Sequence, residues 1–133
     1  MRTNHRWAAI GAGLMFLAVA FGAFGAHLLK ARIPADRLEI FQTGVTYQGM
    51  HALAILLVTC LAPRLSTRTA GFASTLFLGG VVIFSGSLYA LALSGQRWLG
   101  AITPLGGVCF LAAWAVLAIS LAKGPANLPD SAE

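Results

Sequence analysis

Polar and hydrophobic positions are separated into long blocks along this chain. Asp, Glu, Lys and Arg are absent from four stretches, residues 7–29, 40–63, 69–96 and 98–122. Each stretch is longer than the ~20 residues that a helix needs to cross about 30 Å of hydrocarbon. Apolar residues run continuously within them, without the alternation that is typical of membrane barrel strands. The pattern therefore predicts an all-α protein, an integral membrane four-helix bundle.

The boundaries of the spans follow from the residues that flank these stretches. We expect one transmembrane domain over residues 1–125 and a short, polar, disordered tail at 126–133. Its four spans are predicted at about 7–26, 44–62, 69–93 and 104–122. The first span follows two arginines, as in a signal peptide, but its apolar stretch is long. We therefore expect an uncleaved helix.

The second helix should extend beyond the membrane at its N-terminal end. Pro34 suits a first helical turn, and Asp36 and Glu39 suit the positive end of the helix dipole. We expect this helix to start near Pro34, after a polar connector at 27–41, and to enter the hydrocarbon near Gly44. For the fourth helix, Thr103 followed by Pro indicates a capping residue and a first helical position.

The composition indicates that the chain is surrounded by lipid, and it argues against nucleic acid, metal and cofactor as partners. Hydrophobic residues make up 58% of the chain and charged residues 10%, against about 25% charged in soluble domains. The net charge is +5, but the basic residues are spread over tails and loops without a basic face. The lipid bilayer is therefore the expected partner, and nucleic acid is not. Cys60 and Cys109 lie in apolar stretches without metal-ligand spacing, so no metal and no cofactor is expected.

The distribution of positive charge indicates the orientation. An even number of spans places both termini on one side of the membrane. That side carries five basic residues: Arg2, Arg6, Arg64, Arg68 and Lys123. The other side carries four: Lys30, Arg32, Arg37 and Arg97. The positive-inside rule therefore favours cytoplasmic termini, by one charge.

Small residues recur at helical spacing and predict close contacts between helices. Lipid tails are as apolar as leucine, so helices in a membrane associate through close backbone approach and hydrogen bonds. The packing positions predicted in this way are Gly11, Ala18, Gly22 and Gly25 in the first span, Gly79 and Gly86 in the third, and Gly106 in the fourth. A channel lined by small residues would have a similar pattern and stays open as an alternative.

A polar cluster is predicted inside the membrane. Gly44, Tyr47, Gln48 and His51 share one arc of the second helix, at i, i+3, i+4 and i+7. Ser85 and Tyr89 are polar positions of the third span, and we expect both groups of residues to face the interior of the bundle. A neutral His51 there would serve interhelical hydrogen bonding, or else a proton relay or a small-ligand site.

Three long motifs carry a resemblance to a known family. They are GAFGAHLLK at 22–30, FQTGVTYQGMHALAI at 41–55 and FSGSLYALALSGQRWLGAITPLGG at 84–107. The chain resembles the small four-helix family of the bacterial inner membrane that is known as domain of unknown function 423. The resemblance implies a multi-pass inner-membrane protein with no established activity. The matched residues that a family function would use are His27, Tyr47, Gln48, His51, Ser85, Tyr89 and Thr103.

The sequence leaves two kinds of function open. We expect an uncharacterised multi-pass membrane protein that acts as an accessory or structural component, in a homo-oligomer or a larger membrane complex. The alternative is a transporter or channel component that moves a proton or a small solute past the His51 cluster. An enzyme and catalytic residues are not expected, because Ser85 lacks the GxSxG elbow and no histidine has a carboxylate near it in sequence.

Overall fold

Every regular element in the described part of the chain is helical. The computed structural model describes residues 2–124. Four of its helical segments are long and apolar enough to cross a membrane. The prediction of an all-α membrane bundle is therefore confirmed. The tail predicted at 126–133 lies outside the described residues.

The first membrane helix is continuous from Arg2 to Lys30 but not uniform. It consists of α1 (Arg2–Ala20), a π-helical turn η1 (Phe21–Gly25) and α2 (Ala26–Lys30). The predicted connector at 27–41 is reduced to residues 31–34. Polar side chains end the apolar stretch but are compatible with helical backbone, so the helix continues past the membrane boundary.

The second membrane helix, α3 (Ala35–Leu61), begins directly after Pro34, whose backbone is extended (φ −57°, ψ 153°). Its 27 residues span about 40 Å at 1.5 Å per residue, which exceeds the hydrocarbon thickness. The helix therefore extends beyond the membrane, in agreement with the acidic residue in its first turn. It ends in a 3₁₀ turn, η2 (Ala62–Arg64), which contains Pro63.

The third membrane helix again contains a π-helical turn. It runs through α4 (Thr67–Gly80), η3 (Val81–Ser85) and α5 (Gly86–Ser94). Ser66 caps its start by accepting a hydrogen bond from the backbone N–H of Thr69 at 3.1 Å. Gly95 ends it in the left-handed conformation (φ 73°), which glycine adopts without steric cost.

The start of the fourth membrane helix, α6 (Thr103–Ala122), differs from the prediction. A 3₁₀ turn, η4 (Arg97–Ala101), precedes it, and Ile102 rather than Thr103 occupies the capping position. Ile102 already has helical angles (φ −83°, ψ −32°), so the chain enters α6 from a helical turn and Thr103 is not available as a cap. The Thr103 side chain instead contacts Leu99 and Ser87.

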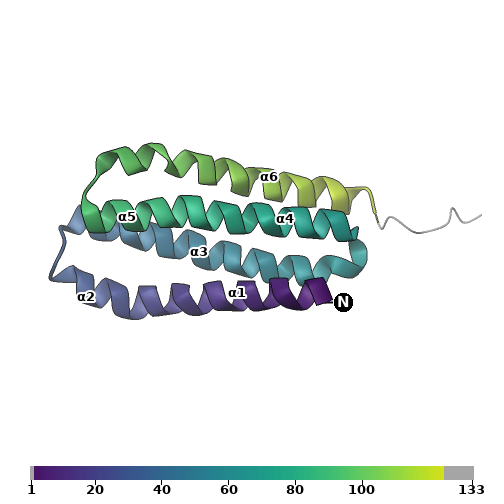
Figure 1. The fold of residues 1–133 in the computed structure, drawn as a ribbon, viewed down its shortest axis with the longest axis horizontal. Coiled ribbons are helices and arrows are strands. Elements are labelled where there is room, and N and C mark those ends of the chain that lie inside the picture. The colour runs from purple at the N-terminus through teal and green to yellow at the C-terminus, as the bar shows by residue number, and fades with distance from the viewer. Residues whose placement is uncertain (1, 125–133) are drawn as a thin grey trace, which may run out of the picture.

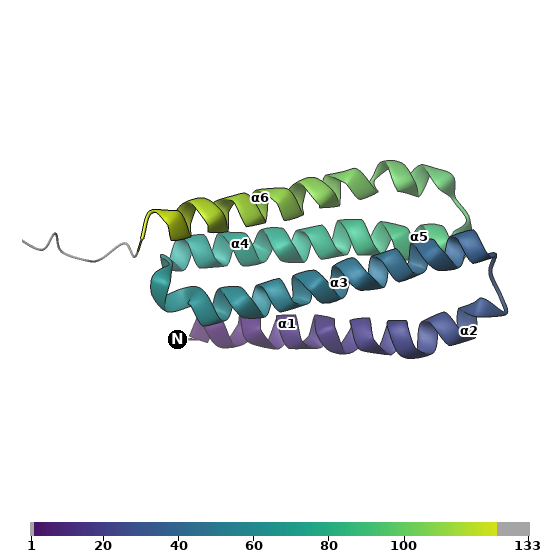
Figure 2. The ribbon, with the colours of Figure 1, turned by 180° about the vertical axis from the view of Figure 1, so that it is seen from behind.

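The helices lie side by side in the order α1, α3, α4 with α5, and α6 (Figures 1 and 2). α1 packs on α3, α3 packs on α4 and α5, and α6 packs on α4 and η3. The start of α1 and the end of α6 lie at the same end of the bundle, as an even number of crossings requires (Figure 1). We call this the terminal end, and the opposite end, with the turns before α3 and after α5, the loop end.

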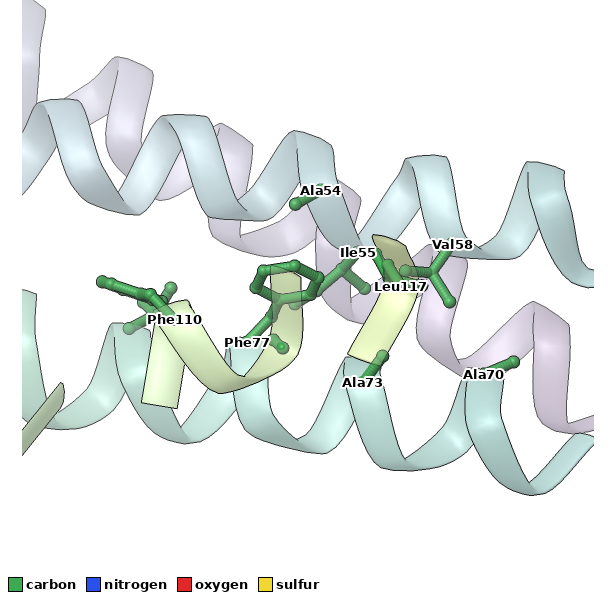
Figure 3. Close-up of a cluster of buried hydrophobic side chains, with 10 residues drawn as sticks. Ala54, Ile55, Val58, Ala70, Ala73, Phe77, Phe110 and Leu117 are labelled. Atoms are coloured by element: carbon green, nitrogen blue, oxygen red, sulfur yellow. The ribbon is translucent and has the colours of Figure 1, made fainter. Parts of the chain in front are cut away.

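A buried apolar cluster lies mainly in the terminal half of the bundle. Figure 3 shows its side chains in close-up. Its members come from α3, α4, η3 and α6: Ala54, Ile55, Val58, Ala70, Ala73, Phe77, Val81, Phe110, Ala113 and Leu117. Phe77 and Ile55 are fully buried at its centre. Since surrounding lipid supplies no hydrophobic force between helices, this cluster stabilises the bundle through close packing.

Glycines of the first helix allow α3 to approach closely. A Cβ atom on Gly11 would lie 2.9 Å from Leu56 Cγ and 3.1 Å from the carbonyl oxygen of Ala52. Gly22 and Gly25 lie against Val45 and Phe41 in the same way, at 3.3 Å and 3.1 Å. Ala18 is buried, and its Cβ is 3.7 Å from where a Cβ on Gly49 would stand.

The packing prediction is wrong for Gly79 and Gly86. A Cβ atom on either residue would meet nothing within 4 Å. Gly80 makes the contact instead, against the Phe110 ring, and Gly106 lies against the backbone of Phe84. Gly80 continues the buried positions Ala73 and Phe77 of α4 at helical spacing. Gly79 and Gly86 share a face with each other, but that face is not the packed one.

Candidate functional site

Most of the buried polar side chains lie next to the apolar cluster, toward the loop end of the bundle, whereas Ser74 lies beside Ala73 in the terminal half. Within the described residues the buried polar side chains are Gln48, His51, Ser74, Ser85, Ser87 and Thr103. Polar groups out of water need hydrogen-bond partners, so the partners of each side chain decide what this region can do.

Both ring nitrogens of His51 are engaged. Its Nδ1 lies 2.8 Å from the carbonyl oxygen of Tyr47, and its Nε2 lies 3.4 Å from the indole nitrogen of Trp114. A carbonyl oxygen only accepts and an indole N–H only donates, so Nδ1 carries the proton and Nε2 accepts. The ring also stacks on Phe110, with centroids 3.5 Å apart and planes 3° apart. The geometry therefore holds one neutral tautomer between α3 and α6.

Gln48 connects three helices. Its amide nitrogen donates to the carbonyl oxygen of Leu14 in α1 at 2.8 Å. Its amide oxygen accepts a hydrogen bond from the Tyr89 hydroxyl of α5 at 2.7 Å. Gln48 is only 3% exposed, and both its amide nitrogen and its amide oxygen are hydrogen-bonded to other helices. The arrangement links α1, α3 and α5 near the loop end.

Ser85 and Tyr89 complete the contact between α3 and the third membrane helix. The Ser85 hydroxyl donates to the carbonyl oxygen of Gly44 at 2.7 Å. A Cβ on Gly44 would lie 2.8 Å from the Tyr89 ring, so only glycine leaves room for that ring. Phe41 packs on Tyr89 as well, with ring centroids 5.0 Å apart. The predicted residues of α3 and of the third span are thus brought together.

Tyr47 is part of this region in a different way from the prediction. Its side chain is 37% exposed at the bundle surface, and its backbone carbonyl, not its hydroxyl, is the group that holds His51. The ring packs on Phe84, with centroids 4.5 Å apart. Tyr47 therefore contributes aromatic packing and a backbone acceptor to the site.

The cluster also includes Ser87 and Thr103, polar positions already evident in the sequence, and further residues that the sequence does not indicate. Ser87 and Thr103 face each other between α5 and α6, with their hydroxyl oxygens 2.7 Å apart. Ser74 is fully buried in α4, and its hydroxyl has no hydrogen-bond partner in the part of the chain that the structure describes. Phe110 and Trp114 are aromatic residues of an apolar helix, so nothing in the local pattern marks them as partners of a histidine.

Both π-helical turns lie beside the polar part of α3. Gly22 and Gly25 of η1 pack against Val45 and Phe41, and Ser85 closes η3 with its bond to Gly44. Such turns leave the regular backbone ladder and recur at functional or tightly packed sites. Here each turn shifts the register of its helix where the helix meets α3.

The chemistry available in the cluster is limited. Over residues 2–124 no group of three or more His, Cys, Asp or Glu side chains is close enough together to hold a metal ion. Gln48 and His51 do not line any of the three hollows described in this part of the chain, which lie toward the loop end. The side chains of Gln48, His51 and Ser85 supply hydrogen bonds between helices, and Tyr47, at the bundle surface, lines one of the hollows.

The fold and its apolar helices define a class, the multi-pass membrane proteins with four transmembrane helices. Residues 21–107 match the family described as "Protein of unknown function (DUF423)". The match covers more than half of the chain, and the chain belongs to this family. The resemblance seen in the sequence motifs is confirmed.

Named relatives of the chain are membrane proteins. The chain is 45% identical over 118 residues to the UPF0382 membrane protein YwdK of Bacillus subtilis, covering 86% of this chain and 94% of the relative. It is 47% identical over 106 residues to the UPF0382 inner membrane protein YgdD of Escherichia coli, covering 78% and 79%. No solved structure matches the chain. The protein is an uncharacterised multi-pass protein of the bacterial inner membrane.

Proposed function

We propose that the chain is an accessory or structural component of the inner membrane that packs against a second copy of itself or a larger membrane complex. One observation carries the proposal: all but one of the buried polar side chains of the described residues bind another helix or the turn before it, the exception being Ser74. Gln48 binds α1 and α5, and His51 binds α6, with hydrogen bonds at both ends of each side chain. Groups that are hydrogen-bonded between helices in this way stabilise one arrangement of helices.

The alternative, transport past His51, needs a group that exchanges protons or ligands. A proton relay requires a nitrogen that is free to bind water or a second titratable group. The two nitrogens of His51 instead face a carbonyl and an indole N–H. The names of the relatives state a membrane location and no transported substance. The saturated site supports a structural role, and for the same reason we propose that the chain is not an enzyme.

The outward face of α3 supports association with a second copy. Alternating steps of three and four residues place six exposed side chains on one seam: Thr43, Thr46, Met50, Leu53, Leu57 and Cys60. This spacing is typical of helices that pack in parallel with a left-handed crossing. We call this stripe the α3 seam. A two-fold axis along the membrane normal would bring two such seams together in register.

We propose cytoplasmic termini. Among the described side chains Arg6, Arg64, Arg68 and Lys123 belong to the terminal end, and Lys30, Arg32, Arg37 and Arg97 belong to the loop end. Arg2 adds a fifth basic residue to the terminal end of the chain. Alkaline phosphatase and green fluorescent protein fusions after Ala126 test this orientation. Fluorescence without phosphatase activity is expected, and the reverse would show an inverted protein.

Purification in mild detergent tests the proposed function. The full chain carrying a C-terminal affinity tag should recover a second copy of itself or a stoichiometric partner protein. Proteoliposomes with an imposed pH gradient provide the opposing measurement. Proton flux above that of empty vesicles, lost in a His51→Gln variant that still folds, would overturn the structural role in favour of transport.

A further inference from the structure

We propose that a hollow at the loop end binds the headgroup of a zwitterionic phospholipid of the phosphoethanolamine type. The hollow, which we call the headgroup pocket, lies between the start of α3 and the end of α5 and has a volume of about 580 Å³. It is lined by Pro34, Asp36, Arg37, Ile40, Leu91, Gly95 and Arg97. Pockets of 300–1,000 Å³ are the usual size for small ligands.

Two guanidinium groups provide the phosphate-binding part. Arg37 comes from the first turns of α3 and Arg97 from η4, so two separate elements bring them to one hollow. The Nη1 atom of Arg37 lies 2.7 Å from where a Cβ on Gly95 would stand. The missing side chain at Gly95 therefore leaves the space that the guanidinium occupies. Arginine binds phosphate oxygens in a bidentate manner, which suits a phosphodiester.

One carboxylate provides the ammonium-binding part. Asp36 lines the same hollow, beside Arg37 in sequence. Two positive groups and one negative group match a ligand with a phosphodiester and a primary ammonium. A phosphoglycerol headgroup would satisfy the arginines only. The side-chain hydrogen bonds found within the described residues involve none of these three charged side chains, which are therefore available to a ligand.

The headgroup pocket is charged near its outer end and apolar deeper in the membrane, which is also the order of the charged headgroup and the apolar chains in a lipid. Ile40 lies one helical turn after Asp36 along α3, and Leu91 lies one turn before Gly95 along α5. Each turn is about 5.4 Å, so the two apolar residues lie deeper in the membrane than the charged ones. Trp98, 62% exposed and next to Arg97, is typical of a side chain at the interface. The gradient favours a lipid over a free phosphate compound, since only a lipid has apolar parts below the phosphate.

Native mass spectrometry of the full chain tests this inference. The protein is purified in detergent with an equal mixture of phosphatidylethanolamine and phosphatidylglycerol that have the same acyl chains. We expect one retained lipid, with phosphatidylethanolamine favoured by about fivefold, as a single ion pair to the ammonium would give. Asp36→Asn should keep the retained lipid and lose the preference. The double variant Arg37→Gln/Arg97→Gln should lose retained lipid of both kinds.

The matched control removes two arginines from the opposite end of the bundle. Arg64→Gln/Arg68→Gln should retain lipid as the unmodified protein does. Equal retention in the Arg37/Arg97 and Arg64/Arg68 variants, at unchanged thermal stability, would overturn the proposal. So would a preference that Asp36→Asn leaves intact. Addition of free phosphoethanolamine or inorganic phosphate tests whether the site binds a lipid headgroup or a soluble phosphate compound. Displacement of the lipid by millimolar amounts of either would show a site for soluble phosphate compounds instead.

Discussion

At the scale of single residues, position within the bundle decides what a polar side chain contributes. Gln42 and Gln48 lie on the same helix, yet Gln42 is exposed and Gln48 is buried with two interhelical hydrogen bonds. The arc of polar residues on α3 was predicted from spacing alone, because helical period places such residues on one face. Their partners Leu14, Tyr89 and Trp114 are distant in sequence, so spacing within one helix does not identify them.

Replacement of Gln48 by Leu should lower the free energy of unfolding by about 1–2 kcal/mol, because it leaves the Tyr89 hydroxyl and the Leu14 carbonyl without their partner. Gln42→Leu is the control, since it removes the same side chain from the exposed face of the same helix. We expect it to change stability by less than about 0.5 kcal/mol. Denaturation in detergent followed by circular dichroism measures both, and similar losses would contradict the bridging role of Gln48.

Two substitutions of His51 separate hydrogen bonding from proton chemistry. His51→Gln keeps a donor and an acceptor and should retain most of the stability. His51→Leu leaves the Trp114 indole N–H without its acceptor and should cost roughly 1–3 kcal/mol. Thermal unfolding and a growth phenotype are measured on both variants. Loss of function in both variants, with folding intact in both, would indicate proton transfer in place of the structural role.

At the scale of elements, charge-free stretches predict the helices well and their internal irregularities poorly. A continuous apolar stretch long enough to cross the hydrocarbon forms a helix, because a helix satisfies all its backbone hydrogen bonds within the segment. The π-helical turns at Phe21–Gly25 and Val81–Ser85 depend on how each helix meets α3, which is a tertiary property. The wrong assignments of Gly79 and Gly86 have another cause: equal spacing shows that two glycines share a face, but not that this face is packed. The wrong cap at Thr103 follows from the 3₁₀ turn before it.

Adjacent glycines of α6 test the contact between α6 and the π-helical turn η3. A Cβ on Gly106 would lie 2.8 Å from Phe84 Cα, whereas a Cβ on Gly107 would meet nothing within 4 Å. Gly106→Ala should therefore lose about 1–3 kcal/mol, because backbone atoms cannot move aside as a flexible side chain does. Gly107→Ala should be neutral or stabilising by up to about 1 kcal/mol from helix propensity. The yield of folded protein and the thermal midpoint measure both, and equal tolerance would exclude a close contact at Gly106.

At the scale of the whole molecule, apolar packing and interhelical hydrogen bonds occupy different levels along the length of the bundle. The apolar cluster fills the terminal half, and the hydrogen-bonded polar groups lie toward the loop end. The order α1, α3, α4 with α5, and α6 leaves one face of α3 without a neighbour in the bundle. Composition predicted the four helices but not this order, because several pairings of short-looped helices fit the same sequence.

The α3 seam gives the last prediction, which concerns association of two copies. In a parallel pair with a two-fold axis, identical seam positions face each other, and Cys60 would meet Cys60 of the second copy. The full chain with Cys109→Ser has Cys60 as its sole cysteine. Treatment of its membranes with an oxidant should give a disulfide-linked dimer, because facing Cα atoms of a parallel pair lie within the roughly 7 Å that a disulfide spans.

The control moves the thiol by one residue, about 100° around α3 and off the seam. The chain with Cys109→Ser, Cys60→Ser and Leu61→Cys keeps one thiol at the same depth in the membrane. It should give little or no dimer on the same non-reducing gel. Equal cross-linking of the two chains would indicate random collisions in the bilayer, and no cross-linking of either would exclude the α3 seam as the contact between copies. A dimer specific to Cys60 would support the seam, since the two thiols lie at the same depth and point in different directions around α3.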